Sequence, residues 1–146
     1  MDTEIPDPRR VVLYARMMAD EPSALRSLRI LVVDDERAIA DSLRMVLADE
    51  HDVVAVTRAE DALTRLRAGE VFDVMLCDLM MPEISGMRFF DELDPSLRSR
   101  VVFLTGGAFT AASVEFLARI PNVCIEKPFQ IEVIRGVVRE AAARAQ

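Results

Sequence analysis

Polar residues that could do chemistry lie at the carboxyl ends of four apolar runs. Asp34 and Asp35 follow "RILVV", Asp78 follows "VMLC", Thr105 follows "VVFL", and Lys127 follows "NVCIE". If these runs are neighbouring parallel strands, their carboxyl ends meet at one edge of a sheet, where open α/β sheets bind their ligands. The spacing therefore predicts one site built from residues that are far apart in the sequence.

The three carboxylates favour a divalent cation. Acidic side chains at hydrogen-bonding range raise one another's pKa unless a cation lies between them. Oxygen ligands without histidine or cysteine favour Mg²⁺, with Mn²⁺ as the alternative, and Mg²⁺ commonly also binds phosphate oxygens. Asp35 has an alternative role as a helix N-cap, but that role explains only one of the two adjacent acids, Asp34 and Asp35.

Asp78 is the best candidate for a nucleophile in such a site. A carboxylate can attack phosphorus and form an acyl phosphate, and Asp78 ends the central run. The Lys127 ammonium and the Thr105 hydroxyl would donate to the phosphoryl oxygens. The residues therefore predict phosphoryl transfer to Asp78.

The elements that must position these residues are short strands alternating with helices. Most of the runs are continuously apolar, as expected for strands covered on both faces of a parallel sheet. Strict alternation with right-handed crossovers predicts an open, doubly wound α/β fold with five parallel strands. The predicted strands span residues 29–34, 52–57, 72–78, 100–105 and 122–127.

Apolar residues at helical spacing predict five helices between and after the strands. Residues 39–47 and 59–66 carry the first two apolar faces, and further helices are expected over 84–93, 110–119 and 129–144. Thr57 and Glu60 have capping-box spacing for the second helix, and Gly69 would end it. The third should end before Asp94-Pro95, because the residue before a proline disfavours the α region.

Composition excludes several classes of function. The chain has 146 residues, a net charge of −7 and no long apolar run, so we expect neither nucleic-acid binding nor membrane insertion, and a cytoplasmic location. Cys77 and Cys124 lie in apolar runs without metal-ligand spacing and are expected to be buried free thiols. His51, which has no partner histidine, is expected in a solvated loop.

Four motifs in order make the sequence similar to the receiver domains of two-component response regulators. They are "ILVVDDE", "MLCDLMMPEISG", "FLTGGA" and "EKPF", and the resemblance covers about residues 29–144. It implies a flavodoxin-like (βα)5 fold with strand order 2-1-3-4-5. It also implies that Asp78 accepts a phosphoryl group from a histidine kinase or histidine phosphotransfer protein.

The resemblance also assigns roles at the site. Asp35 would bind Mg²⁺ directly, Asp34 mainly through water, and the Met80 backbone carbonyl would be a further ligand. Thr105 would bond the phosphoryl oxygen and move with it, and Lys127 would pair with it, with a cis Lys127–Pro128 peptide bond. Leu79 and Met81 are expected only to pack.

One departure from the family concerns how a phosphorylated state would be transmitted. Receivers usually carry Tyr or Phe three residues before the motif lysine, and this chain has Cys124 there. Phe109 is a candidate substitute, although a core position at a helix start is the better interpretation. Gly106 and Gly107 should leave the loop beside Thr105 mobile and accessible.

Residues 1–28 lie outside the resemblance. Asp7 and Pro8 could start a helix with an apolar face formed by Val11, Tyr14, Ala15 and Met18. That face would be offered to another subunit or to the domain itself, while a disordered leader or linker is an equal alternative. The sequence thus leaves open whether the protein forms a homodimer.

The sequence is compatible with three functions. The leading one is a phosphoacceptor module that signals to a downstream target through protein contacts, since no DNA-binding domain follows in the sequence given. It would not be an enzyme beyond its own phosphorylation and slow dephosphorylation. A scaffold that is never phosphorylated is the alternative, and an aspartyl-phosphate phosphatase is disfavoured because Met80 replaces the second aspartate that such enzymes use.

Overall fold

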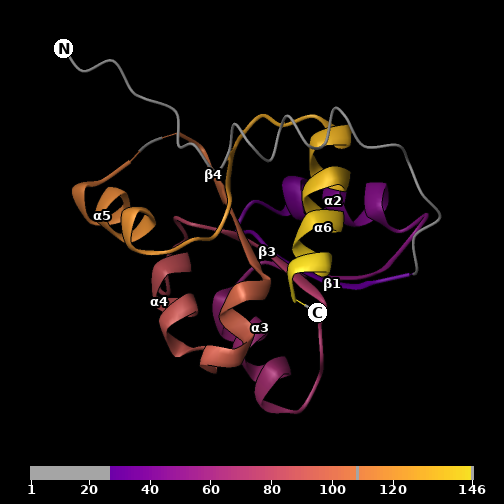
Figure 1. Cartoon of the computed structure of the whole chain (residues 1–146), viewed down its shortest axis with the longest axis horizontal. Helices are drawn as coiled ribbons and strands as arrows, with labels where there is room; N and C mark the ends of the chain where they lie inside the picture. The colour runs from indigo at the N-terminus through magenta and orange to yellow at the C-terminus, as the bar shows by residue number, and fades with distance from the viewer. Residues whose placement is uncertain (1–26, 108, 146) are drawn as a thin grey trace.

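Five apolar runs form one parallel β-sheet in the order β2-β1-β3-β4-β5. The structure is a computed structural model, and it describes residues 27–107 and 109–145. The predicted fold class and strand order are confirmed (Figure 1). The strands are β1 (Arg29–Val33), β2 (Asp52–Val56), β3 (Val74–Asp78), β4 (Val101–Thr105) and β5 (Cys124–Glu126).

The middle of the sheet is fully enclosed, which explains the continuous apolar runs. Every residue of β3 and β4 is buried, whereas β2, at one edge, is only partly covered. The register places Asp78 beside Leu104 and Thr105 beside Glu126. The carboxyl ends of these strands therefore lie together at one edge of the sheet.

In the described part of the chain, four α-helices and one 3₁₀ helix connect the strands, and a fifth α-helix follows β5. Where bounds were predicted, helices and strands agree with them to within about two residues, the usual uncertainty of element ends. The elements are α2 (Arg37–Leu47), α3 (Ala59–Arg67), α4 (Gly86–Glu92), η1 (Pro95–Arg100), α5 (Ala111–Arg119) and α6 (Ile131–Ala145).

Two details of the helix ends differ from expectation. The N-cap of α3 is Arg58, without a side-chain cap, so the predicted Thr57 capping box is wrong: Thr57 lies one residue too early. After α4 the chain does stop before Asp94-Pro95, but Pro95 also opens η1, and the Asp94 side chain caps it by accepting from the Ser96 N–H. The same dipeptide thus ends one helix and starts another.

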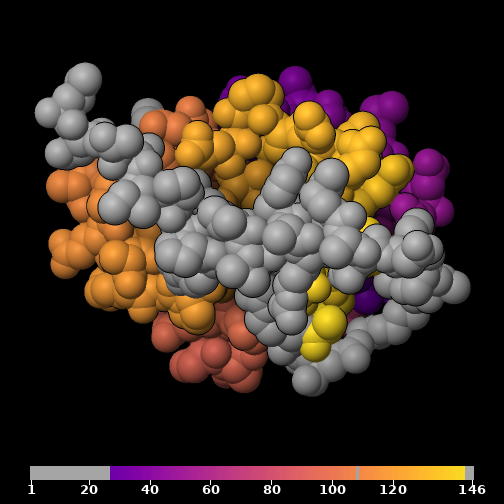
Figure 2. All heavy atoms as spheres, turned by 45° about the horizontal axis from the view of Figure 1, so that its top comes forward, coloured from indigo at the N-terminus to yellow at the C-terminus, as the bar shows by residue number. Residues whose placement is uncertain are grey.

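The helices cover the sheet in two layers. α2 and α6 lie on one face, where they pack on Ile30, Val32, Val102 and other side chains of the strands. α3, α4 and α5 cover the other face, around Phe103 and its neighbours (Figure 1). In the space-filling view, the orange atoms of α5 lie at the left, and the salmon atoms of α4 lie below them (Figure 2).

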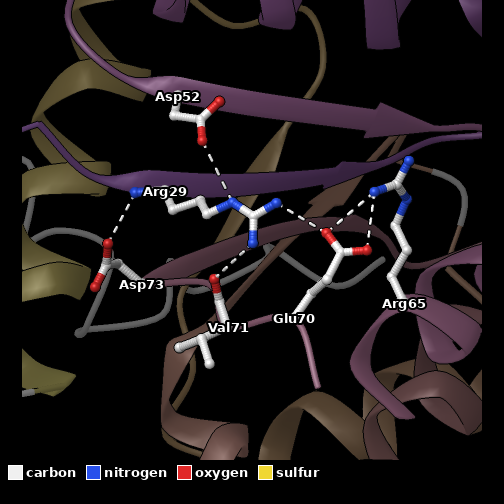
Figure 3. Close-up of polar contacts among 6 residues, drawn as sticks. All are labelled: Arg29, Asp52, Arg65, Glu70, Val71 and Asp73. Atoms are coloured by element: carbon white, nitrogen blue, oxygen red, sulfur yellow. Dashed lines mark hydrogen bonds and ion pairs between the residues drawn. The ribbon is translucent and has the colours of Figure 1, made fainter. Parts of the chain in front are cut away.

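Arg29 ties together the amino ends of three strands (Figure 3). Its guanidinium binds Asp52 at the start of β2 (3.3 Å) and Glu70 in the loop before β3 (2.8 Å). It also lies 4.6 Å from the centre of the Phe72 ring, while its backbone N–H donates to Asp73. This network forms at the edge of the sheet opposite the predicted site.

The expectation for His51 is wrong, because this side chain is buried. It is 8% exposed, and its Nδ1 accepts a hydrogen bond from the backbone N–H of Leu28 at 3.1 Å. Leu28 itself is 3% exposed and belongs to the core. The imidazole therefore anchors the chain where it enters β1.

Other expectations concern buried thiols and the ends of the chain. Cys77 and Cys124 are both buried, and neither forms a disulfide bond, as predicted. The predicted helix and linker within residues 1–28 fall outside the described residues except for Ser27 and Leu28. Among the described residues, no helix combines the length and apolar character needed to cross a bilayer.

Candidate functional site

Three carboxylates meet at the carboxyl edge of the sheet. Asp34 and Asp35 follow β1, and Asp78 ends the neighbouring strand β3. One carboxylate oxygen from each lies within 4.8 Å of the other two. Asp34 and Asp78 are buried and Asp35 is exposed, so the group opens to solvent on the Asp35 side.

Lys127 follows the edge strand β5, and its side chain reaches this acidic group. Its Nζ lies 2.7 Å from Asp34 Oδ2 and 3.4 Å from Asp78 Oδ2, and its side chain is only 11% exposed. The predicted convergence of Lys127 with the acids from β1 and β3 is therefore present. The ammonium also lies 3.5 Å from Glu36 Oε1, a contact that sequence reasoning missed.

Glu36 begins the first helix of the domain. It is the N-cap of α2, without a side-chain cap, and its N–H donates to Asp34 Oδ1 at 2.9 Å. Asp35 therefore does not cap this helix, and the alternative role considered for it is wrong. The sequence did offer a signal for Glu36, because this residue is the third acid of the "DDE" run.

Thr105 lies at the end of β4, between the acids and the lysine. Thr105 is fully buried, and its backbone carbonyl accepts a hydrogen bond from the Lys127 N–H at 2.7 Å. The hydroxyl accepts a hydrogen bond from the Gly107 N–H at 3.2 Å, within its own loop. The structure thus places Thr105 and Lys127 side by side, with the hydroxyl held by the loop that follows it.

The loop after Asp78 is fixed by main-chain contacts. The Met80 N–H lies 3.4 Å from Asp78 Oδ1, and the Met80 residue is 40% exposed. Leu79 is buried and Met81 packs against the core, so both have the packing role expected of them.

Gly86 allows this loop to close. A Cβ at position 86 would lie 2.4 Å from the Asp78 carbonyl oxygen and 2.8 Å from Leu79 Cα, distances that real side chains do not occupy. The Gly86 N–H also donates to the Leu79 carbonyl at 2.9 Å. The glycine in the "PEISG" run is therefore needed for close backbone approach beneath Asp78.

The electrostatics of the site centre on Asp78. Burial, with the negative charge of Asp34 adding to it, raises the pKa of Asp78 from 3.8 to about 7, although Lys127 opposes the rise. Burial alone would lower the pKa of Lys127, but its close contact with the Asp34 carboxylate and the charge of Asp78 outweigh this and raise that pKa. The lysine thus stays charged beside carboxylates that repel each other.

The residues fit a divalent cation. Three oxygen donors without histidine or cysteine suit Mg²⁺ or Mn²⁺. Asp34 Oδ2 is buried, and its close approach to Lys127 lacks the geometry of a standard hydrogen bond. A buried oxygen without a hydrogen-bond partner can be satisfied by a cation and its bound water. The same cation would also favour the charged form of the neighbouring Asp78, whose pKa is raised.

Cys124 occupies a small buried position next to an aromatic cluster. It lies beside Phe103 in the sheet and is 4% exposed. Phe103, Phe90 and Phe116 pack against each other with ring centres 5.4 to 5.7 Å apart. Aromatic rings from α4, β4 and α5 therefore lie on the face of the sheet to which Cys124 contributes.

Phe109 is not the core residue that was expected. It precedes Thr110, the N-cap of α5, and is only partly buried. The Lys127–Pro128 peptide bond is cis, as the resemblance implied.

Comparison with known proteins gives a consistent result. A family model described as the response regulator receiver domain matches residues 30–139. The transcriptional regulatory protein DltR of Streptococcus agalactiae is 30% identical over 114 residues, which cover 77% of this chain and 50% of DltR. BtsR of Escherichia coli is 35% identical over 80 residues, covering 53% of this chain and 34% of BtsR. The chain thus spans half or less of these curated relatives.

Solved structures support the same fold. A response regulator receiver domain protein from Clostridium thermocellum matches with a TM-score of 0.71 and 23% identity, over 80% of this chain and 95% of that one. A CheY-like receiver domain protein from Methanospirillum hungatei gives 0.72 and 24%, over 82% and 96%. At these identities the structural likeness speaks for the fold alone.

Proposed function

The chain belongs to the response regulator receiver domain family, and from this premise we propose that it accepts a phosphoryl group on Asp78. The observation that carries the proposal is the position of this carboxylate. Asp78 lies within 4.8 Å of the acids from β1 and 3.4 Å from the Lys127 ammonium. The proposed nucleophile, an ammonium group and the carboxylates proposed to bind a cation thus lie close together.

The proposed reaction transfers phosphorus from nitrogen to oxygen. A carboxylate oxygen of Asp78 attacks the phosphorus of a phosphohistidine, the new P–O bond forms, and the P–N bond breaks. The electron pair of that bond returns to the imidazole nitrogen, which takes up a proton from solvent. This mechanism needs the ionised carboxylate of Asp78, whose pKa is raised. A positively charged group beside Asp78, such as Lys127, lowers that pKa and therefore favours the reaction.

Residues of this chain would bind the reacting group in distinct ways. Asp34, Asp35, Asp78 and the Met80 carbonyl are proposed to hold Mg²⁺, which when bound would neutralise charge on the phosphoryl oxygens. Lys127 would shift from its ion pair with Asp34 to a phosphoryl oxygen. The Thr105 hydroxyl would give up its acceptor role toward Gly107 and donate to another oxygen.

The proposed donors are a histidine kinase or a histidine phosphotransfer protein, in the cytoplasm. DltR and BtsR are described as transcriptional regulatory proteins, but this chain matches only part of each. We propose that the described domain passes its state to a protein target, because a two-state domain can bind a partner differently before and after phosphorylation. No turnover of an external substrate is proposed.

The test is stoichiometric labelling by a small phosphodonor. The full chain is incubated with acetyl phosphate and Mg²⁺, and intact mass is followed over time. One added phosphoryl group is expected in the parent chain and none in Asp78→Asn or after chelation of Mg²⁺. Asp61→Asn, which removes an exposed carboxylate on α3, is the matched control and should label like the parent.

Two other results would overturn the proposal. Rapid and repeated release of inorganic phosphate would indicate a phosphatase. A folded protein that takes no label from acetyl phosphate or from a phosphorylated phosphotransfer protein would indicate a scaffold that never becomes phosphorylated.

A further inference from the structure

Glu36 contacts both members of the ion pair between Asp34 and Lys127. Its backbone N–H donates to Asp34 Oδ1 at 2.9 Å, and its carboxylate oxygen Oε1 lies 3.5 Å from the ammonium nitrogen of Lys127. That nitrogen lies 2.7 Å from the other carboxylate oxygen of Asp34, Oδ2. Glu36 is neither a proposed metal ligand nor the proposed phosphoacceptor, so those roles do not explain its contact with Lys127.

The backbone of Glu36 is fixed on both sides. Its N–H is bound to Asp34, and its carbonyl accepts hydrogen bonds from the N–H groups of Ile39 and Ala40, at 3.0 Å each, at the start of α2. The carboxylate therefore extends from a defined point, and only the side-chain torsions decide where it lies.

Glutamate is not a preferred residue at the N-cap of a helix. Short polar side chains such as Ser, Thr, Asp and Asn are preferred there, because their oxygen can accept from the N–H groups of the first turn. Glu36 is the N-cap of α2, and its side chain makes no such bond. Proteins tend to break local rules of this kind at functional sites. The side chain of Glu36 lies near Lys127 instead.

Three carboxylates surround the Lys127 ammonium, which has three N–H donors. Besides Asp34 and Glu36, Asp78 contributes Oδ2 at 3.4 Å. The side chains of Asp34 and Asp78 are buried, whereas that of Glu36 is 62% exposed. Glu36 therefore contacts the ammonium from the solvent side, and the two buried acids contact it from within the site.

The proposed reaction changes two of these three contacts. Asp78 ceases to be a free carboxylate when it becomes an acyl phosphate, and Asp34 is proposed to bind the cation. Lys127 must then exchange Asp34 for a phosphoryl oxygen. Glu36 takes no part in either change, so its contact with the lysine can persist throughout the reaction.

We propose that Glu36 is a positioning residue, which acts through Lys127 by keeping the ammonium in place while Asp34 is exchanged for a phosphoryl oxygen. This role rests on the proposed phosphorylation of Asp78. An ion pair with an exposed partner is weak, so Glu36→Gln should slow labelling by acetyl phosphate at saturating Mg²⁺ about two- to fivefold. Loss of a negative charge alone would act in the opposite direction, because it would favour the approach of an anionic phosphodonor.

Two further variants separate this role from a charge effect and from helix stability. The side chain of Glu60 is 63% exposed but pairs with Arg58, so Glu60→Gln is the matched control and should label like the parent. Glu36→Asp keeps the charge and suits the N-cap, but it is too short to contact Lys127. It should be at least as stable as the parent in thermal denaturation and still label about two- to fivefold more slowly.

A double-mutant cycle tests whether the effect passes through the lysine. Lys127→Met removes the ammonium and keeps an apolar side chain of similar length. Adding Glu36→Gln to this variant should slow labelling no further. The same slowing with and without the ammonium would show that Glu36 acts on another group, and would overturn the proposal.

Nuclear magnetic resonance tests the contact without metal or phosphodonor. Lys127 is the only lysine of the chain, so ¹³C-labelled lysine gives one Cε signal. In the presence of a chelator, the order parameter of this Cε should be lower in Glu36→Gln and Glu36→Asp than in the parent, and unchanged in Glu60→Gln.

The outcomes distinguish this role from the proposed function. A parent that takes no label would overturn the phosphorylation of Asp78, and the role of Glu36 with it. A parent that labels no faster than Glu36→Gln, or a lysine equally ordered in all variants, would overturn the role of Glu36 alone.

Discussion

Replacing Asp78 by asparagine should stabilise the protein in the absence of divalent cations. Burial and the neighbouring Asp34 raise the pKa of Asp78 from 3.8 to about 7. A tenfold change in a protonation equilibrium is about 1.4 kcal/mol, so the ionised carboxylate costs the folded state up to about 4 kcal/mol. Asparagine keeps an oxygen acceptor toward the Met80 N–H but carries no charge. The free energy of unfolding is therefore expected to rise by about 2 to 4 kcal/mol at pH 8.

The pH dependence of this gain has a definite sign. Because the pKa is higher in the folded state, the folded protein binds more protons than the unfolded chain between about pH 4 and 7. The parent therefore loses this stability as the pH rises through 7. The difference between Asp78→Asn and the parent should be near zero at pH 4 and reach its full value at pH 8.

Urea denaturation provides the assay. The chain has no tryptophan, so unfolding is followed by far-ultraviolet circular dichroism in the presence of a chelator. Adding Mg²⁺ at ten times its dissociation constant should stabilise the parent by about 1.4 kcal/mol and the variant by less, because the variant lacks one ligand. Asp61→Asn should change stability little at any pH. An Asp78→Asn protein no more stable than the parent at pH 8, or a gap that does not close toward pH 4, would refute the electrostatic account.

Three further predictions follow from particular contacts. Gly86→Ala should cost about 1–3 kcal/mol and slow labelling of Asp78, because the new Cβ would lie 2.4 Å from the Asp78 carbonyl; parent-like denaturation and labelling would contradict this. Arg29→Met should cost about 1–2 kcal/mol in urea denaturation, since its half-buried guanidinium joins two strands and a loop. Arg65→Met, which loses only the more exposed pair with Glu70, should lower the free energy of unfolding by less. Equal losses of stability in the two variants would show that the Arg29 network contributes no more than the Arg65–Glu70 pair. Burial lowers the pKa of His51 below 6.5, so its contribution to stability is present above pH 6.5 and lost as the pH falls further. Proton NMR titration of this single histidine should give a pKa below 6.5, and a value above 6.5 would be inconsistent with its burial.

Much of the fold could be predicted because its main signals are local. Continuous apolar runs such as "VMLC" indicated strands covered on both faces, and Gly69, with a φ of 98°, ends α3 as predicted. The strand order came with the family resemblance, since periodicity alone does not order strands. η1 was missed because Asp94-Pro95 signals both a helix stop and a helix start.

The candidate site was predicted through topology, and what was missed depends on tertiary contacts. Parallel strands bring their carboxyl ends together, so Asp34, Asp78 and Lys127 could be grouped without knowing any distance. The burial of His51 depends on Leu28, which is 23 residues away, and no local pattern signals that contact. The need for glycine at position 86 likewise appears only when two backbone segments meet.

The most direct measurement maps the modified residue. After incubation with acetyl phosphate and Mg²⁺, borohydride reduction converts an aspartyl phosphate to homoserine, which tandem mass spectrometry locates in the peptide containing residues 77–86. The account predicts homoserine at position 78 and at no other acidic residue. Homoserine at position 34 or 35, or phosphate recovered on a serine or threonine, would contradict it.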